Sequence, residues 1–566
     1  MSPRLLAVLV VLLFPQSAAA WTREQVADHA LRGERAWAAL THPVTGAVTD
    51  TIAPGPHAVR DYNYGTFLLA DAQLRAAQRT GDSALADTAV AHVLGLINRN
   101  GGRPPGDPFN QLAAAAILSD GRAGRLAAYG RIAAPIERMV AQFAPFTGHG
   151  FADPAVYDNW RLVWAAAAIR IVSSGLVGDA GTIAEHPARL RAEVARIVSE
   201  LVPAHAGPPV RTAYGTGRVL SDPGRQPNAY HVFSTLLLEH IFETDPSVFS
   251  AAGLSVREQA GRYALALMAP DGQLTHSGRS MEQSWVLAAA ADLGAMRASQ
   301  NGPDARAWRA FAERALNRLV RVHGTFADGT TPVVPGLRQR PDQRIADHYS
   351  SMSQYDGLSL YLIEHAAAHW PDTAGRAPAA KVLTADLSPG GAGLVWGHAG
   401  NVWWAIQGWR AAGDDGRYSQ GIVSVKIRAA GRWRELFASR PQRGTPSIDW
   451  KLRTRRGTAR LALTRATGSG ARAVLRGHWQ IGGRRVRSAR WAVHVRAGAL
   501  HVTTERLRRG ERVGAAVWAA PGAKRVDTSM NARASTATAC TVTASGRACA
   551  HRIRAQRAGR IRLTFR

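Results

Sequence analysis

Cysteine is nearly absent from this chain of 566 residues, which contains only Cys540 and Cys549. Two cysteines exclude a zinc site built from thiolates alone, and once they pair they leave no free thiol to act as a nucleophile. In an oxidising compartment we expect them to form one disulfide that closes a short hairpin. Any chemistry must therefore come from other side chains.

Long apolar runs are also rare. The run Leu5–Phe14 is too short to cross a bilayer, which takes about 20 residues, and no later stretch reaches that length. Because the run follows Arg4 and precedes the small residues Ala18–Ala20, it is typical of a secretory signal cleaved before Trp21. No cysteine follows it, so a lipid anchor is not expected. We predict a signal peptide over residues 1–20, no membrane span, and a secreted protein.

Acidic residues are scarce in the last third of the chain. Residues 1–380 hold 34 Lys and Arg against 33 Asp and Glu, whereas residues 381–566 hold 36 against 8. The formal charge of +29 is thus a property of one region, whose field attracts polyanions unless it is merely a soluble basic surface. That region lacks the interleaved aromatics of a recognisable nucleic-acid motif. We therefore expect an anionic polysaccharide as partner and no specific nucleic acid.

Helical periodicity fills the chain from Trp21 to about Pro378. Apolar residues recur at steps of three and four, as in Leu190, Val194 and Leu201, and Gly, Pro or Asp separates the segments. No fixed repeat period is present, which disfavours a regular solenoid. We predict an (α/α) toroid of helical hairpins over residues 21–380. The expected helices include Thr22–Leu40, Tyr64–Thr80, Ser83–Asn98, Arg122–Phe143, Trp160–Ser174, Pro187–Val202, Val232–Phe242, Ser255–Met268, Met281–Ala298, Ala305–Val322 and Gln354–Ala368.

The pattern changes at about Gly391. Short runs such as Val402–Trp409, Gly421–Arg428 and Trp491–Val495 alternate apolar and polar residues between Gly-rich turns. Such alternation is typical of antiparallel strands with one buried face. We predict an antiparallel β-sandwich over residues 381–566, so the chain as a whole is multidomain, with α structure followed by β structure.

Three polar clusters each precede or open a helix. One contains Asn228, Tyr230 and His231, the second is Asp158–Trp160, and the third is His276–Ser280. Each alone is typical of a helix cap or of a hydrogen-bonded core residue. Three clusters of the same design favour one site at one rim, with the His at its mouth.

On this layout and these clusters, the chain resembles the polysaccharide lyases of the chondroitin AC/hyaluronate, alginate and heparinase type. The resemblance implies that Asn159 and Arg279 neutralise a substrate carboxylate. It also implies that Tyr230 and His231 serve as base and acid. The order of this ring pair departs from the hyaluronate type, in which His precedes Tyr by several residues. Adjacent side chains on a helix diverge by about 100°, so Tyr230 and His231 need not face the same substrate.

The reaction implied is β-elimination on a uronic-acid polymer. A base removes the proton alpha to the carboxylate, and an acid protonates the leaving oxygen, a role open to Tyr349 or Tyr355 as well. The scheme needs no metal or other cofactor, and we identify no zinc-binding pattern among the His residues. We expect a monomer. The residues expected to contact substrate are Tyr64, Trp160, Asn228, His276, Gln283, Tyr349 and Tyr355.

Two other functions fit parts of the sequence. A glycoside hydrolase needs two carboxylates astride the scissile bond, and the candidates are Asp61, Asp158, Glu282 and Asp356. A non-catalytic exported protein would instead grip a polyanion with the basic region, while the helices only support it. Absorbance of an unsaturated uronate product separates a lyase from both alternatives.

Overall fold

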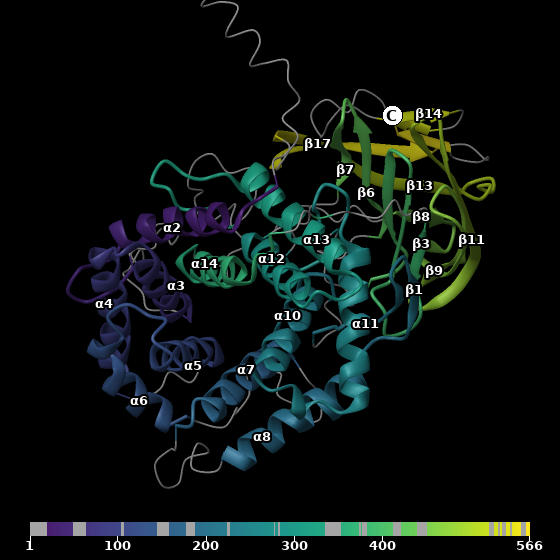
Figure 1. The fold of residues 1–566 in the computed structure, drawn as a ribbon. Helices are drawn as coiled ribbons and strands as arrows, with labels where there is room; N and C mark the ends of the chain where they lie inside the picture. Colours follow the sequence, from purple (N-terminus) through teal and green to yellow (C-terminus); the bar gives the residue numbers. More distant parts are fainter. Residues whose placement is uncertain are drawn as a thin grey trace, which may run out of the picture.

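The structure is a computed structural model of the chain. The part from Arg23 to His369, called the helical half below, is mainly helical, and the part from Leu383 to Phe565 is an antiparallel sheet, as the sequence predicts (Figure 1). No helix among the described residues is long and apolar enough to cross a membrane. The structure describes residues 20–48, 64–102, 107–143, 158–176, 187–222, 227–274, 276, 278–280, 283–333, 352–372, 375, 382–410, 420–438, 450–519, 526–529, 532–534, 539–543, 546–555 and 562–565.

Six of the described helices, which we call the inner helices, pack in a closed series. Each contacts the next along the chain, and the last packs back against the first (Figure 1). Their facing sides are rich in Ala, Leu and aromatic residues that are fully buried. The inner helices are α3 (Tyr64–Thr80), α5 (Pro108–Arg122), α7 (Asn159–Ser173), α10 (Ala229–Thr244), α12 (Ser284–Ser299) and α14 (Met352–His369).

The first turns of the inner helices lie at the same end. Trp160 of α7 is edge-on to Phe109 of α5, with ring centroids 5.4 Å apart, and Phe109 stacks on Phe233 of α10 at 5.9 Å. Phe233 contacts Trp285 of α12 at 5.5 Å, and Trp285 stacks on Tyr355 of α14 at 6.2 Å. Because helix N-termini carry partial positive charge, this end of the molecule favours anionic groups.

A second helix packs outside each inner helix. α2 covers α14, α4 covers α3, α6 covers α5, α8 covers α7, α11 covers α10, and α13 covers α12. Capping fixes several starts: Thr22 forms a capping box with Gln25, and Asp82 accepts from the amide of Leu85. The outer helices are α2 (Arg23–Ala39), α4 (Ser83–Arg99), α6 (Ala133–Ala141), α8 (Pro187–Arg196), α11 (Ala251–Leu267) and α13 (Ala305–Arg318), with the short α9 (Val202–His205) after α8.

The contact between α3 and α14 depends on glycine. A Cβ atom on Gly65 would lie 2.6 Å from the Cα atom and the carbonyl oxygen of Gln354, and Gly357 lies equally close to the backbone of α3. We expect Gly65→Ala to push the two helices apart and to cost about 1–3 kcal/mol of unfolding free energy, as overpacking of a filled core does. Urea denaturation measures this. Gly302→Ala is the control, since a Cβ there meets nothing within 4 Å; equal stability of the two variants would contradict the prediction.

The second half forms a single connected sheet of antiparallel strands among the described residues. Its main path runs β14-β18-β12-β11-β10-β9-β8-β13-β7-β6-β5-β4-β3, and β15, β16 and β17 join at β13. The strands are β3 (Leu383–Asp386), β4 (Leu394–Ala399), β5 (Val402–Gln407), β6 (Gly421–Ala429), β7 (Arg432–Ala438), β8 (Lys451–Thr454), β9 (Gly457–Gly468), β10 (Arg472–Ile481), β11 (Arg484–Arg496), β12 (Ala499–Thr503), β13 (Arg512–Ala519), β14 (Val526–Ser529), β15 (Ala532–Ala534), β16 (Ala539–Thr543), β17 (Gly546–Ala555) and β18 (Arg562–Phe565).

Among the described residues, the sheet curves over a core of its own. β5 also contacts β12, and β3 contacts β9, although these strands lie apart in the pairing order. The core contains four fully buried tryptophans: Trp404, Trp450, Trp479 and Trp491. The predicted antiparallel character is thus confirmed, while closure into a sandwich stays a prediction.

The two cysteines fall on neighbouring strands. β16 and β17 pair in a register that sets Cys540 opposite Cys549. This is the hairpin that the sequence predicts, and the disulfide across it stays a prediction.

A buried ionic cluster joins the helical half to the sheet. Lys426 of β6 is fully buried, and its Nζ donates to Asp271 at 2.7 Å and to Glu435 at 3.2 Å. Arg318 of α13 donates to the same Asp271 carboxylate at 2.7 Å. Nearby, the hydroxyl of Tyr263 donates to Asp386 at 2.8 Å. Specific polar contacts therefore fix the sheet against α11 and α13.

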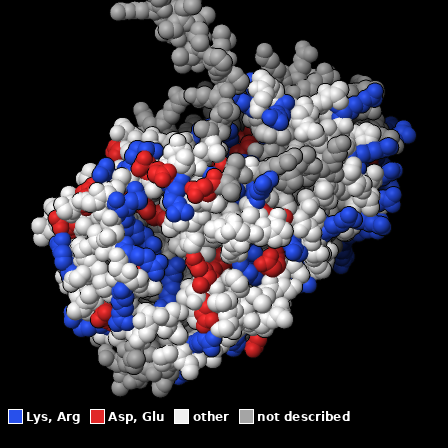
Figure 2. Space-filling view, viewed as in Figure 1, with Lys and Arg blue, Asp and Glu red and all other residues white. Residues whose placement is uncertain are grey.

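The charge asymmetry predicted from the sequence is visible on the surface. Figure 2 shows Lys and Arg along the edge formed by the sheet with few acidic groups beside them, whereas both signs mix over the helices. The sheet is thus the basic face of the molecule.

Candidate functional site

The candidate site is centred on Asp222, which precedes α10. The backbone N–H of Asn159 donates to Asp222 Oδ1 at 2.8 Å, and the Asn159 side-chain amide donates to Oδ2 at 3.0 Å. The preceding Asp158 caps α7 by accepting from the amide of Arg161 at 2.7 Å. Asp158 and Asn159 are buried, whereas Asp222 is half-buried. The first turn of α7 therefore holds two carboxylates together, and Asp222 is the more accessible of them.

Asp222 is poised to exchange a proton near neutral pH. Burial is the main cause that raises its pKa to about 7, and the negative charge of Asp158 acts in the same direction, against the opposing effects of the Asn159 amide and Arg279. The sequence analysis did not identify this residue, because a single Asp before Pro223 is typical of a turn. The only available signal was its position eight residues ahead of Tyr230.

Tyr230 of α10 and Arg279, which precedes α12, complete the site. The Arg279 guanidinium lies 5.8 Å from the centroid of the Tyr230 ring, and the Tyr230 hydroxyl is 3.1 Å from the Ser280 hydroxyl. Ser280 has a φ of 58°, a left-handed conformation that non-glycine residues seldom adopt. Three predicted residues, Asn159, Tyr230 and Arg279, are thus brought to one place with Asp222.

Two predicted substrate contacts lie in the aromatic chain beside this site. Trp160 is half-buried and packs on Phe109, and part of its side chain is exposed beside the site. Tyr355 is buried against Trp285 and contributes mainly to packing.

The predicted position of His231 at the mouth is wrong. His231 is fully buried, its Nδ1 accepts from the amide of Leu220 at 3.0 Å, and its ring packs edge-on against Tyr263. Burial lowers its pKa to about 3. Because neighbouring side chains on a helix diverge by about 100°, Tyr230 faces the site while His231 faces the core. His231 is a core residue.

The other polar residues of the predicted clusters are also mainly structural. His276 is fully buried, its Nε2 lies 3.0 Å from the Leu267 carbonyl, and its ring packs on Trp403 of the sheet. Gln283 is buried and accepts from Trp285 Nε1 at 2.6 Å. Asn228 is buried with a φ of 72° at the start of α10. Their positions near the first turns of inner helices misled the sequence interpretation.

Several predicted residues are not placed by the structure. Asp61, Glu282 and Tyr349 lie outside the described residues, as does the side chain of Tyr64. Asp356 is buried and accepts from Trp37 Nε1 at 2.7 Å and from the Thr331 amide at 3.1 Å. Asp356 is therefore a structural carboxylate.

A separate cavity of about 330 Å³ lies between the helical half and the sheet. Trp396, Trp403 and Trp433 line it together with Arg314 and Arg428, and none of its lining residues that the structure describes carries a carboxylate. Such a lining suits binding of a flat or anionic group more than acid–base chemistry.

No protein-family model matches this chain, and no curated protein matches it. Among solved structures, the alpha-1,6-mannanase GH76A from Salegentibacter sp. HEL1_6 covers 61% of this chain and 99% of its own, at 12% identity and a TM-score of 0.40. The Lin0763 protein from Listeria innocua covers 61% and 97%, at 13% identity and a TM-score of 0.40. The unsaturated glucuronyl hydrolase from Streptococcus agalactiae covers 63% and 94%, at 10% identity and a TM-score of 0.43. Similarity of this degree assigns neither a reaction nor a substrate.

Proposed function

We propose that the chain hydrolyses glycosidic bonds in an anionic carbohydrate, with Asp222 as proton donor and Asp158 as the second carboxylate. The position of Asp222 carries the proposal: it is half-buried, bound by both N–H groups of Asn159, and under the influence of Asp158 and Arg279. In this proposal the helical half is an (α/α) toroid, and the end where its inner helices begin is the substrate cleft.

Two carboxyl groups with different environments suit the two tasks of glycoside hydrolysis. One must hold a proton for the leaving oxygen, and the other must be ionised to activate water or attack the sugar. Burial and the charge of Asp158 favour the protonated form of Asp222, which fits the acid. One carboxylate oxygen of Asp158 accepts a hydrogen bond from the Arg161 amide. In this proposal Asp158 takes the second role.

Local charge and shape favour an anionic sugar. Arg279 is half-buried beside the site, and the converging helix N-termini add partial positive charge. Trp160 offers an aromatic surface for a sugar ring. The basic sheet, proposed as a β-sandwich, would hold the rest of a polyanion. Secretion, a monomeric state and the Cys540–Cys549 disulfide remain parts of the same proposal.

One observation favours the elimination chemistry as a second candidate. Arg279 lies over the Tyr230 ring, so a cation that could bind a substrate carboxylate stands beside a phenol that could take the proton. Tyr230 would then be the base and Asp222 the acid for the leaving oxygen. Asn159 is less suited to neutralise a substrate carboxylate, since its amide already binds Asp222.

Product analysis tests the proposal. We expect incubation with a panel of uronate-containing and neutral polysaccharides to produce new reducing ends without ultraviolet absorbance from an unsaturated uronate. Reducing ends with that absorbance would establish the lyase instead. A protein that binds these polymers but releases no reducing ends would contradict both reactions, and heat-inactivated protein is the control for background hydrolysis.

A further inference from the structure

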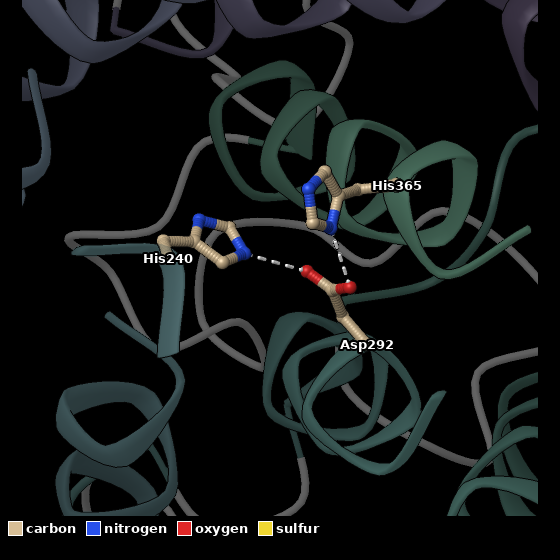
Figure 3. A group of neighbouring side chains, drawn as sticks. All are labelled: His240, Asp292 and His365. Carbon is tan, nitrogen blue, oxygen red and sulfur yellow. Dashed lines mark hydrogen bonds and ion pairs between the residues drawn. The ribbon is translucent and has the colours of Figure 1, made fainter. Parts of the chain in front are cut away.

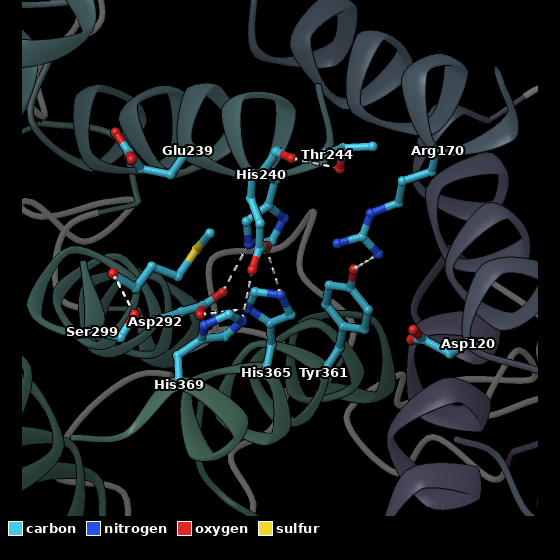
Figure 4. A network of polar contacts seen from close by, with 12 residues as sticks. Asp120, Arg170, Glu239, His240, Thr244, Asp292, Ser299, Tyr361, His365 and His369 are labelled. Carbon is cyan, nitrogen blue, oxygen red and sulfur yellow. Dashed lines mark hydrogen bonds and ion pairs between the residues drawn. The ribbon is translucent and has the colours of Figure 1, made fainter. Parts of the chain in front are cut away.

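A second polar cluster, drawn in Figures 3 and 4, lies toward the C-terminal ends of α10 and α14. Asp222 precedes α10, so the cluster is at the other end of the inner helices. Asp292 of α12 accepts from His365 Nδ1 of α14 at 2.7 Å and from His240 Nε2 of α10 at 3.0 Å. Glu243 of α10 lies 3.7 Å from His365 Nε2 and 3.1 Å from His369 Nε2. The cluster therefore links three inner helices near the ends of α10 and α14.

His365 has two carboxylate neighbours, but a neutral ring has only one N–H to donate. Both ring nitrogens face a carboxylate, Asp292 on one side and Glu243 on the other. A neutral imidazole carries one N–H, so only one of these two contacts can be a donated hydrogen bond. That proton belongs on Nδ1, because the contact with Asp292 is the shorter. Nε2 then carries no proton, and its lone pair faces Glu243 and lies near His369.

We propose that Glu243, His365 and His369 bind a divalent transition-metal ion of the zinc type, with Asp292 holding His365 in the required orientation. Two imidazoles and one carboxylate are a ligand set that Zn²⁺ adopts when a further position stays open to water. A ligating His commonly donates its other ring N–H to a carboxylate, which is the part of Asp292 here. His240 secures Asp292 in turn.

The separations between ligand atoms fit such an ion. The ligand atoms of Glu243, His365 and His369 all lie within 4.8 Å of one another. Zinc bonds of about 2.0–2.2 Å in a tetrahedron place neighbouring ligand atoms about 3.4 Å apart. The carboxylate-to-imidazole distances of 3.1 and 3.7 Å lie on either side of that value.

Access and charge are also suitable. The side chains of Glu243 and His369 are 39% and 24% exposed, whereas His365 is 7% exposed, so an ion can enter from solvent and keep a water ligand. Glu243 and Asp292 together balance a double positive charge. The nearby Arg170 donates to the hydroxyl of Tyr361 at 3.2 Å. Figure 4 shows its guanidinium directed toward Tyr361.

The sequence analysis identified no zinc-binding pattern, whereas the proposed site includes two His residues of α14. His365 and His369 are four residues apart, so they share one face of α14. The third ligand comes from α10 and cannot be located from the local pattern of α14. α10 and α14 each contact α12, so a shared ion would connect two inner helices across a third.

Metal titration of the untagged, full-length protein tests the site. After removal of metal with a chelator, we expect calorimetry to show one Zn²⁺ bound per chain, and Co²⁺ to give the visible absorption of a four- or five-coordinate ion. His369→Gln and Glu243→Gln should each weaken Zn²⁺ binding at least about tenfold, and so should Asp292→Asn, as loss of an orienting partner does. His494→Gln, at an exposed position of β11, is the matched control and should bind as the parent does.

Zn²⁺ should also raise the Tm of the parent and the control but not that of His369→Gln. His369 is partly exposed, so this variant is expected to fold, and its circular dichroism spectrum verifies that. Absence of one-to-one Zn²⁺ binding to the parent, or binding by His369→Gln and Glu243→Gln equal to the control, would overturn the proposal. The result is independent of the reaction at Asp222.

Discussion

Asp222→Asn is expected to abolish most activity on a natural glycan, with a fall of about 10²–10⁴ in kcat/KM, the usual contribution of a general acid. Activity on an activated aryl glycoside should fall much less, because a good leaving group needs no proton. The amide can still accept from the Asn159 backbone, so the local fold should persist. Steady-state kinetics on the two substrate types measures the contrast.

Asp158→Asn should behave differently. Asn caps helices as well as Asp does, so α7 should remain intact. Activity should be lost on both substrates, because leaving-group chemistry does not replace the second carboxylate. Asp28→Asn, on the exposed face of α2, is the control and should match the parent. Equal losses on both substrates for Asp222→Asn would rule out Asp222 as the acid.

The same residue gives a pH signature. Since the proton on Asp222 must be present, kcat/KM should decline as pH rises through about 7. The raised pKa also affects stability: between about pH 4 and pH 7 the folded state holds a proton that the unfolded state has released, so unfolding free energy falls as pH rises. Asp222→Asn removes this pH-dependent contribution. The Tm of the variant minus the Tm of the parent should therefore increase from pH 5 to pH 8.

Lys426→Ala is expected to have the largest effect on stability. Lys426 is fully buried and binds Asp271 and Glu435, so its removal leaves excess negative charge at the junction. Breaking a buried ion pair from one side costs about 3–5 kcal/mol. We expect the helical half and the sheet to unfold in separate calorimetric transitions, whereas Lys451→Ala, at a half-exposed position of β8, should change little.

Charge balance distinguishes this effect from lost packing. Adding Glu435→Gln to Lys426→Ala leaves Asp271 paired with Arg318, and much of the stability should return if charge and not packing is the cause. The positive charge of Lys426 lowers the pKa of Asp271, so the contribution of the pair is present above the unfolded pKa of about 4 and is lost as pH falls further. The parent should therefore lose more stability in acid than Lys426→Ala. Unchanged stability of Lys426→Ala would show that the cluster is not what joins the halves.

The sequence predicted the positions of helices and strands better than it predicted which residues contact one another. Helix α10 was expected over Val232–Phe242 and spans Ala229–Thr244, since its apolar pattern is continuous. Helix α5 was missed, although Asp107 caps it and Pro108 occupies its first turn. A run of alanines there gave little periodicity to detect.

Side-chain direction was the part of the site that sequence could not supply. Asn159, Tyr230 and Arg279 were identified because each belongs to a polar cluster near the start of a helix. The assignment of His231 was wrong because adjacent side chains on a helix point in different directions: Tyr230 faces the site, and His231 lies in the core. Asp222 and the Glu243–His365–His369 group depend on contacts between segments 63 and more than 100 residues apart, which no local pattern encodes.

The close approach of Gly65 to Gln354 means that the helical half is completed by its last inner helix. Nearly 290 residues separate these two positions, so α3 leaves the ribosome long before the surface that covers it exists. Contacts of such sequence separation are slow to form, and the incomplete chain exposes apolar helix faces in the meantime. A chain that is exported unfolded would avoid that interval, since all the inner helices would then be present when folding begins.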